Sequence, residues 1–455
     1  MTMIPKFYKH PVFYLSVLAC MVGALAACNT APKKPTPIEV AQPPKLPAPQ
    51  APKPTPPNPA TKNVPTPAVT PSVSAPAPIV EPKQFYGSFG EWKSDFINRA
   101  IARGYRANDV YALMNNASLN QQVISLDGKQ AEFAKMPWEY AESATSGNRV
   151  STGRAKADEY PSLLSRLESR YGVPREIVVA IWGMESSYGA ATGNTDLVNA
   201  LSSLAYDGRR RSFAEGELIA MLDMINRGDV NRSQLKGSWA GGMGHTQFIP
   251  STWLAQGVDG NNDGQKNPWV ISDALSSTAN YLSGSGWIAG LDAFYEVRLP
   301  SHFNHQLIGQ KQPLSAWQQA GLLSINGTSL PNSNTPAELW LPAGILGPAL
   351  LLTPNFDVIK VYNNSSNYAL GVALLAKRIG KQSGIVSNWP RHERPLSSAQ
   401  VRRLQENLNA KGYNAGTPDG MAGTNTRRAF AQWQSDNGKI PDGFITQNSA
   451  NELIW

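Results

Sequence analysis

Residues 173–189, VPREIVVAIWGMESSYG, decide how the rest of the chain is interpreted. Pro174 suits the first position of a helix and Gly189 suits the position just past its end, so the stretch predicts a helix. Its apolar side chains recur at helical spacing and form one stripe: Ile177, Val178, Ile181, Met184 and Tyr188.

Glu185 falls inside this apolar stripe, four residues after Ile181. An ionised carboxylate that faces a core is costly, so burial is expected to raise its pKa. The negative end of the helix dipole acts in the same direction. A glutamic acid that stays protonated near neutral pH is suited to acid catalysis on a glycosidic oxygen. The alternative, a Glu that reaches solvent or pairs with an Arg, stays open on this stretch alone.

Length and charge narrow the class of protein. A chain of 455 residues has room for two or three domains. The formal net charge of +8 and the pI near 9.3 favour an anionic partner, which means nucleic acid, a membrane surface or an acidic polymer. The Lys and Arg residues are scattered and no nucleic-acid-binding motif stands out, so we do not expect nucleic acid.

The first residues read as a secretion signal. A basic segment precedes an apolar run over residues 12–27, which is too short for a comfortable membrane span. The run ends in Leu-Ala-Ala-Cys28, which resembles a bacterial lipobox, and this predicts lipidation of Cys28. Cys20 is a poorer match for the same pattern, and a plain signal peptide is the other alternative. Asn29 after the cysteine favours sorting to the outer membrane, by resemblance to enterobacterial lipoproteins.

Composition divides the remaining chain into segments. Residues 29–83 are rich in Pro, Ala, Thr and Lys, which predicts an extended tether without a core. We place a catalytic domain at 84–390 and a second domain at 391–455. Cys20 and Cys28 are the only cysteines in the sequence, so a disulfide or a cysteine metal site beyond residue 28 is excluded.

The pattern of residues 84–390 is mainly helical. Helical periodicity is found at 89–101, 110–114, 160–171, 173–188, 197–204 and 212–227, around Tyr281, and late in 361–379. Two short strands are expected at 295–299 (YEVRL) and 357–362 (DVIKVY). The fold class is therefore mainly α (α+β), with a small β part.

Two loops stand out in this domain. Residues 237–253, GSWAGGMGHTQFIPSTW, are rich in glycine, which allows close backbone approach and indicates a loop that lines a cleft. An ordinary Gly-rich turn is the alternative.

The second loop, residues 258–274, resembles an EF-hand loop. Asp259, Asn261 and Asp263 occupy positions 1, 3 and 5, Gly264 follows at position 6, and Gln265 would offer its backbone carbonyl. Position 12 is Val270 rather than Glu, so Asp273 would have to close a longer loop around the ion. The alternative is a turn rich in Asx and Gly that holds no ion.

The second domain predicts a small three-helix core. One helix carries Val401, Leu404, Leu408 and Tyr413, and a second helix is capped by Thr424. Three further apolar residues are expected to complete the core: Phe444, Leu453 and Ile454.

Several separated motifs together resemble the lytic murein transglycosylase B family, over about residues 85–385. The resemblance implies a lysozyme-like domain in which GMESSYG supplies the single catalytic acid, Glu185. It implies substrate contacts from SWAGGMGHTQFIPS, ANYL, VYNNSSNYA and, with poorer matching surroundings, PWEYAES, at these positions: Ser238, Gln247, Tyr281, Tyr362, Asn363 and Tyr140. The EF-hand-like loop also has a counterpart in some members, including the late Asp. Residues 391–455 resemble the peptidoglycan-binding domain type 1.

The resemblance also implies the chemistry. Ordinary glycosidases use two carboxylates, and Asp196 and Asp207 are candidates for the second one. The resemblance implies that no second carboxylate takes part. Glu185 would protonate the glycosidic oxygen and then deprotonate the C6 hydroxyl, which leaves a 1,6-anhydro-N-acetylmuramyl end. No cofactor is needed, and calcium would be structural. The expected partner of a monomeric enzyme is the peptidoglycan glycan strand. A muramidase-type hydrolase and a non-catalytic wall-binding scaffold stay open as alternatives.

Overall fold

The computed structural model describes residues 87–128 and 135–455 of the chain. The predicted signal segment, the lipidation site at Cys28 and the Pro-rich segment 29–83 lie outside these residues. Among the described residues, no helix combines the length and apolarity needed to cross a lipid bilayer.

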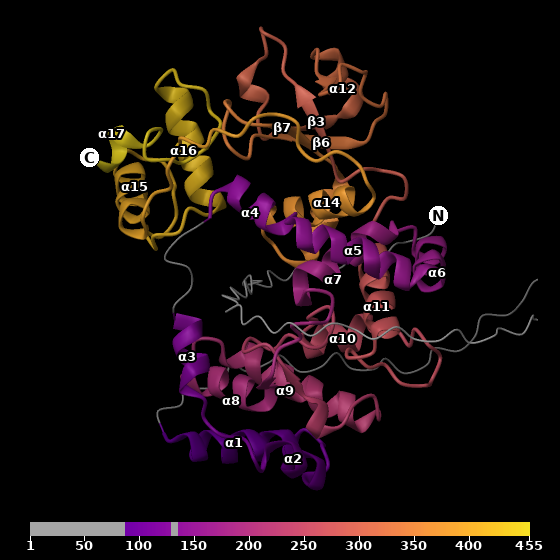
Figure 1. The fold of residues 1–455 in the computed structure, drawn as a ribbon. Helices are drawn as coiled ribbons and strands as arrows, with labels where there is room; N and C mark the ends of the chain where they lie inside the picture. Colours follow the sequence, from indigo (N-terminus) through magenta and orange to yellow (C-terminus); the bar gives the residue numbers. More distant parts are fainter. Residues whose placement is uncertain (1–86, 129–134) are drawn as a thin grey trace, which may run out of the picture. The chain divides into compact units, whose positions relative to one another are not determined.

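Helices make up most of the described chain (Figure 1). Before the sheet, they are α1 (Phe89–Ala102), α2 (Ala107–Met114), α3 (Gln121–Gly128), α4 (Pro137–Ala144), α5 (Gly147–Glu159), α6 (Pro161–Tyr171), α7 (Arg175–Ser186), α8 (Leu197–Asp207), α9 (Arg211–Asn226), α10 (Pro250–Gln256) and α11 (Ile271–Gly284). The later helices are α12 (Leu314–Gln319), α13 (Pro354–Tyr362), α14 (Ser366–Ile379), α15 (Ser398–Ala410), α16 (Thr424–Asp436) and α17 (Asn451–Ile454), and two 3-10 turns lie at Arg232–Gln234 and His305–Leu307.

The strands form two antiparallel sheets. The larger sheet has the order β4-β6-β7-β3-β5 and is built from β3 (Phe294–Arg298), β4 (Lys311–Pro313), β5 (Leu323–Ser324), β6 (Pro336–Trp340) and β7 (Ala349–Leu352). The smaller pairs β1 (Thr195–Asp196) with β2 (Lys236–Gly237). The predicted strand at 295–299 is confirmed as β3. The predicted strand at 357–362 is wrong, because Pro354 starts a helix at its first position and α13 runs through this segment.

Helix α7 lies within the main core, in contact with α5, α6, α11 and α14 (Figure 1). Residues 177–183 are all buried, so α7 is covered on every side rather than along one stripe. A helix that is apolar all round belongs inside a protein. The burial of α7 therefore fixes the position of the side chains on its last turn.

The end of α7 differs from the prediction. The helix stops at Ser186, and Ser187 and Tyr188 follow with φ of 50° and 62°, in the left-handed region. Tyr188 consequently leaves the predicted stripe and folds back, with its ring 5.9 Å from that of Trp182. A Cβ at Gly183 would lie 2.5 Å from the Tyr188 ring, so only glycine fits there. This return of the chain closes the helix directly after Glu185.

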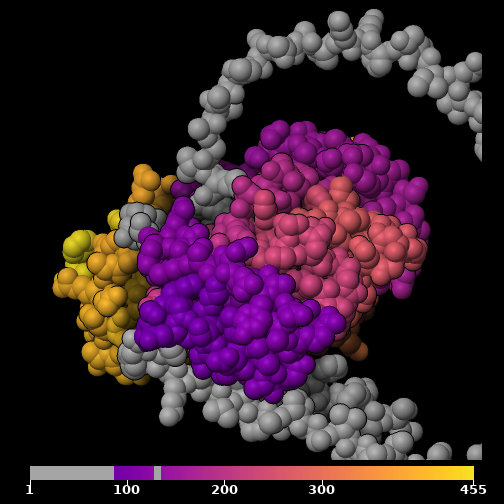
Figure 2. Space-filling model, turned by 90° about the horizontal axis from the view of Figure 1, so that it is seen from below, coloured from indigo at the N-terminus to yellow at the C-terminus, as the bar shows by residue number. Residues whose placement is uncertain are grey.

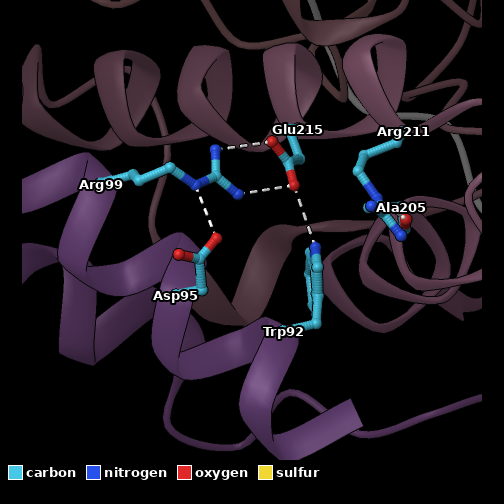
Figure 3. A network of polar contacts seen from close by, with 6 residues as sticks. All are labelled: Trp92, Asp95, Arg99, Ala205, Arg211 and Glu215. Atoms are coloured by element: carbon cyan, nitrogen blue, oxygen red, sulfur yellow. Dashed lines mark hydrogen bonds and ion pairs between the residues drawn. The ribbon is translucent and has the colours of Figure 1, made fainter. Parts of the chain in front are cut away.

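A second core lies under α1, α2, α8 and α9, and α1 and α2 form much of the face seen in Figure 2. A buried polar network ties α1 to α9 (Figure 3). Both terminal nitrogens of Arg99 donate to Glu215, at 2.8 Å each, and Trp92 Nε1 donates to the same carboxylate at 2.9 Å. Arg99 also donates to Asp95 at 2.7 Å. Because Glu215 is buried, these bonds satisfy a carboxylate that would otherwise destabilise the fold.

The C-terminal helices build the predicted small core, with two corrections. Val401, Leu404, Leu408, Leu453 and Ile454 lie in it as expected. Helix α16 begins with Thr424, so the cap position falls on Gly423 and no side chain caps the helix. Phe444 lies outside this core and packs with Met136, Trp138 and Ala343. The predicted role of Phe444 is wrong because residues of the preceding domain cover its ring.

Candidate active site

Glu185 lies on the last turn of α7 and is half-buried. Its Oε1 accepts a hydrogen bond of 2.5 Å from the hydroxyl of Tyr368. Burial raises the pKa of Glu185 to about 7, although the Tyr368 hydrogen bond acts in the opposite direction. The expected rise in pKa is present, and its cause is the desolvation that the apolar surroundings predict. A carboxyl group with this pKa can deliver and take up a proton near neutral pH.

Tyr368 is the residue that the sequence interpretation missed. It lies buried in the first turn of α14, where the Ser365 side chain accepts from the Tyr368 backbone N–H. It belongs to the segment VYNNSSNYA, for which the family resemblance implies Tyr362 and Asn363 as site residues. The available signal was a second tyrosine in the same segment, six residues after Tyr362. Only the contact between α14 and α7 shows that Tyr368 reaches the acid.

Two further predicted tyrosines lie close enough to sense the charge of Glu185. Burial raises the pKa of Tyr140, on α4, and the charge of Glu185 raises it further. Burial likewise raises the pKa of Tyr362 well above its usual range, with the same second cause. The charge of Glu185 therefore acts on Tyr140 and Tyr362, and Tyr368 contacts its carboxyl group directly.

Tyr281 and Tyr362 form an aromatic group with Phe248 of the Gly-rich loop. The ring centroids of Tyr362 lie 5.8 Å from Tyr281 and 5.2 Å from Phe248. The Tyr362 hydroxyl donates to Thr246 O at 2.8 Å, and the Tyr281 hydroxyl donates to Val361 O at 3.3 Å. Faces and hydroxyls of tyrosines suit a sugar ligand, which has both apolar and polar sides.

Ser238 and Gln247 lie together within the Gly-rich loop. Ser238 Oγ accepts from the Gly242 backbone N–H at 2.9 Å. Gln247 Nε2 donates to Thr192 O at 3.0 Å and to Gly244 O at 2.8 Å. Both side-chain oxygens approach Gly242, where an added Cβ would lie 2.7 Å from Gln247 Oε1 and 2.9 Å from Ser238 Oγ. The loop thus presents two polar side chains at one place.

Asn363 follows directly after α13 and has an unsatisfied polar atom. Its Oδ1 is buried, and it finds no hydrogen-bond partner among the described residues. Buried polar atoms are nearly always paired, so such an atom requires an explanation. Its position next to Tyr362 points to a ligand with a donor group.

The two candidates for a second carboxylate are engaged elsewhere. Asp196 caps α8 by accepting from Asn199 N at 2.9 Å and pairs with Arg232 at 2.9 Å. Asp207 pairs with Arg209 at 2.8 Å. Among the groups of the described residues, burial and Tyr368 shift the pKa of Glu185, and no second carboxylate does.

The EF-hand-like loop, residues 258–274, follows the Gly-rich loop and is called the acidic loop below. Hydrogen bonds of its own side chains hold its shape. Asp259 accepts from the backbone N–H groups of Asp263 at 3.2 Å and Gly264 at 2.8 Å. Asn261 Oδ1 accepts from Asp263 N at 3.1 Å, and Asp263 Oδ1 accepts from Gln265 N at 2.9 Å. The Gln265 N–H lowers the pKa of Asp263, and so does the Asn261 side chain. The loop therefore holds carboxylate and amide oxygens in one turn.

Asp273 lies on the first turn of α11 rather than on the loop, and it is fully buried. Its two oxygens accept from Gly260 N and Asn267 N, at 2.9 Å each, and burial raises its pKa. Across residues 87–128 and 135–455, no three His, Cys, Asp or Glu side chains gather as a metal site. The oxygen donors of the loop fit calcium in type, while Asp273 uses its oxygens within the protein.

Comparison with known proteins places this site in context. The profile of the transglycosylase SLT domain family matches residues 88–377, and the profile of a peptidoglycan binding domain matches residues 397–452. Membrane-bound lytic murein transglycosylase B of Escherichia coli is 30% identical over 298 residues, which cover 62% of this chain and 77% of that protein.

Two solved structures extend the comparison. SltB3 from Pseudomonas aeruginosa, in complex with NAG-anhNAM-pentapeptide, superimposes with a TM-score of 0.77 at 42% identity and covers 80% of this chain and 99% of its own. The Escherichia coli lytic transglycosylase Slt35, in complex with calcium, gives a TM-score of 0.55 at 30% identity, over 64% of this chain and 92% of its own.

Proposed function

The chain belongs to the transglycosylase SLT domain family and is a peptidoglycan lytic transglycosylase, and from this premise we propose that Glu185 performs both proton transfers of the reaction. The proposal rests on one observation. Burial raises the pKa of the Glu185 carboxyl group to about 7, and the Tyr368 hydroxyl donates a hydrogen bond to it. The protonated form of Glu185 donates its proton to the glycosidic oxygen between MurNAc and GlcNAc.

The second proton transfer completes the reaction without water. The bond between C1 of MurNAc and the protonated glycosidic oxygen breaks, and the GlcNAc part leaves with the proton as a hydroxyl. The N-acetyl group of the substrate stabilises the cation that develops at C1. The Glu185 carboxylate then takes the proton of the C6 hydroxyl, whose oxygen attacks C1 and closes the 1,6-anhydro ring. The attack is intramolecular, so it gains from proximity when the ring is held in place. The engagement of Asp196 and Asp207 with arginines supports a mechanism with one carboxylate.

The residues around Glu185 supply the binding of the glycan strand. Ser238 and Gln247 hold the N-acetyl group and hydroxyls, and the rings of Tyr281 and Tyr362 pack on the sugars. The Asn363 Oδ1 is buried without a partner among the described residues, which supports a role as acceptor for a substrate donor. Tyr140, the sixth member, is supported by its proximity to the charge of Glu185.

Calcium is proposed as a structural ion of the acidic loop. Asp259, Asn261 and Asp263 would provide side-chain oxygens and Gln265 its carbonyl. Asp273 would complete the site from α11 with the second lone pair of Oδ2, which accepts one hydrogen bond, from Asn267 N. The calcium complex of the relative Slt35 supports this assignment. A bound ion would hold the loop in place and takes no part in the proton transfers.

The cellular setting is proposed from the N-terminal sequence. Lipidation of Cys28 would place a monomeric enzyme on the outer membrane, facing the periplasm, with residues 29–83 as a tether. The relative named as membrane-bound lytic murein transglycosylase B is consistent with such a setting.

Mass spectrometry of the products released from purified peptidoglycan sacculi tests the proposed reaction. We expect muropeptides that end in 1,6-anhydro-MurNAc. Reducing MurNAc ends would identify a hydrolase instead, and no release by a folded protein would identify a wall-binding scaffold.

A further inference from the structure

His245 lies at the tip of the Gly-rich loop and is separate from the proposed acid and sugar-binding residues. The tip is formed where Met243 N donates to Phe248 O at 2.9 Å. His245 is half-buried there. Thr246 and Gln247 follow it in the chain. The Thr246 carbonyl accepts from the Tyr362 hydroxyl, and the Gln247 side chain donates to Gly244 O. We call Thr246, Gln247 and Tyr362 the substrate-binding wall.

On one side, His245 contacts the turn of α7 that carries the acid. Trp182 Nε1 donates to His245 Nδ1 at 3.2 Å. The Ser186 hydroxyl donates to the His245 carbonyl oxygen at 2.5 Å. Trp182 and Ser186 lie on either side of Glu185 in the same helical turn. One residue of the loop therefore holds that turn by its ring and by its backbone.

On the other side, the same tip contacts two further elements. The His245 backbone N–H donates to Pro268 O at 3.0 Å, within the acidic loop. The carbonyl of Thr246 accepts from the Tyr362 hydroxyl at 2.8 Å, and Gln247 comes next in the chain. The acid and the substrate-binding wall are thus connected through three consecutive residues.

We propose that His245 is a positioning residue, which sets the distance from Glu185 to Tyr362 and Gln247 by clamping the last turn of α7. The inference rests on the proposed role of Glu185. A general acid must lie within hydrogen-bond reach of its oxygen, and a misplacement of about 1 Å can cost about a hundredfold in rate. His245 acts through Glu185 and makes no bond with the substrate.

The hydrogen bond from Trp182 fixes the protonation state of the ring. Because Nδ1 accepts, the ring is neutral and its proton is on Nε2. Burial lowers the pKa of His245, a backbone hydrogen bond from the ring to Trp269 opposes this, and the charge of Lys156 lowers it further. Lys156 of α5 lies over the Trp182 ring at 5.8 Å. The other titratable groups around this contact are Tyr160, Tyr188 and Glu185, of which the two tyrosines pack on Trp182.

The test compares substitutions at both ends of the clamp in the full-length protein. His245→Ala removes the acceptor, and we expect kcat on purified sacculi to fall by about tenfold or more with a smaller change in KM. In His245→Asn, the amide oxygen replaces Nδ1 as acceptor, and we expect it to recover most of this loss. Trp182→Phe removes the donor, and the double variant with His245→Ala is expected to be no slower than His245→Ala alone.

Three results would overturn the proposal: an unchanged kcat in a folded His245→Ala protein, no recovery in His245→Asn, or losses that multiply in the double variant. The pH profile is the second readout. In the wild type, protonation of His245 at low pH removes the acceptor, so the acid limb of kcat/KM is expected to move to lower pH in His245→Asn. If the acid limb of kcat/KM stays at the same pH in His245→Asn, the hydrogen bond between Trp182 and His245 does not position Glu185.

Glu185→Gln and product analysis in the same assay separate this proposal from the proposed function. An active Glu185→Gln protein would reject Glu185 as the acid whatever the His245 variants do. An inactive Glu185→Gln with an unaffected His245→Ala would reject the clamp alone.

Discussion

At the scale of single residues, the function depends on one carboxyl group in apolar surroundings. Glu185→Gln keeps the shape and the hydrogen-bonding reach of the side chain but cannot deliver a proton. We expect release of anhydro-muropeptides to fall by at least about a hundredfold, with an unchanged circular dichroism spectrum and unchanged binding to sacculi. Turnover near the wild-type rate would contradict the assignment of the acid.

The pKa of Glu185 also predicts a pH dependence. Because the first step needs the protonated acid, kcat/KM should fall as the pH rises through about 7. The Tyr368 hydroxyl stabilises the carboxylate form, so Tyr368→Phe should raise this pKa and move the alkaline limb to higher pH. A pH–rate profile of both proteins measures the shift, and a limb that moves to lower pH would show that Tyr368 has another role.

At the scale of elements, the acidic loop gives a prediction about calcium. Without an ion, the carboxylates of the loop repel one another, and a ligand that binds only the folded state stabilises it. Calcium at a hundredfold excess over its Kd should raise Tm by about 5 °C, and magnesium should do much less. Asp259→Ala should remove the shift, and activity should persist in chelator at low temperature. A melting curve indifferent to calcium would reject the site, and immediate inactivation by chelator would reject a purely structural role.

The attachment of α1 to α9 predicts an unequal effect of two carboxylates. Glu215→Ala leaves Arg99 and the Trp92 N–H without their buried partner, and we expect a loss of about 3 kcal/mol in the free energy of unfolding. Asp95→Ala removes only the half-exposed partner of the same arginine and should cost about 0.5 kcal/mol. Urea unfolding measures both, and equal losses would show that the network does not hold α1.

The elements also show what the sequence can predict. Helix periodicity predicted α1, α6, α8 and α9 to within a few residues, and the apolar stripe around Glu185 predicted the raised pKa of its carboxyl group. The strand expected at 357–362 is a helix, because Pro354 suits the first position of α13 and the β-branched residues that follow continue the same helix. Tyr368 was missed because its contact with Glu185 depends on the packing of two helices that are distant in sequence. Such long-range contacts leave no periodic signal.

At the scale of the whole molecule, the N-terminal sequence predicts how the enzyme is retained. Cys28→Ala removes the residue that would carry the acyl chains. Because acyl chains provide the firm attachment to the membrane, the protein should move from outer-membrane fractions to the soluble periplasm. Cys20→Ala is the matched control and should leave the protein on the membrane. Fractionation and immunoblotting measure both. Release of the Cys20 variant instead would place the attachment at that residue.

The packing of Phe444 limits how freely the wall-binding region can be exchanged between proteins. A domain that moves between genes by recombination brings its own core with it, here the group around Leu404 and Phe430. Phe444 depends instead on Met136, Trp138 and Ala343, which belong to the enzyme. In a hybrid that joins residues 391–455 to an unrelated enzyme, the ring of Phe444 would be uncovered. In the enzyme that lost residues 391–455, the ring of Trp138 would lose the cover of Phe444. Successful exchange therefore requires compensating substitutions on both sides of the junction.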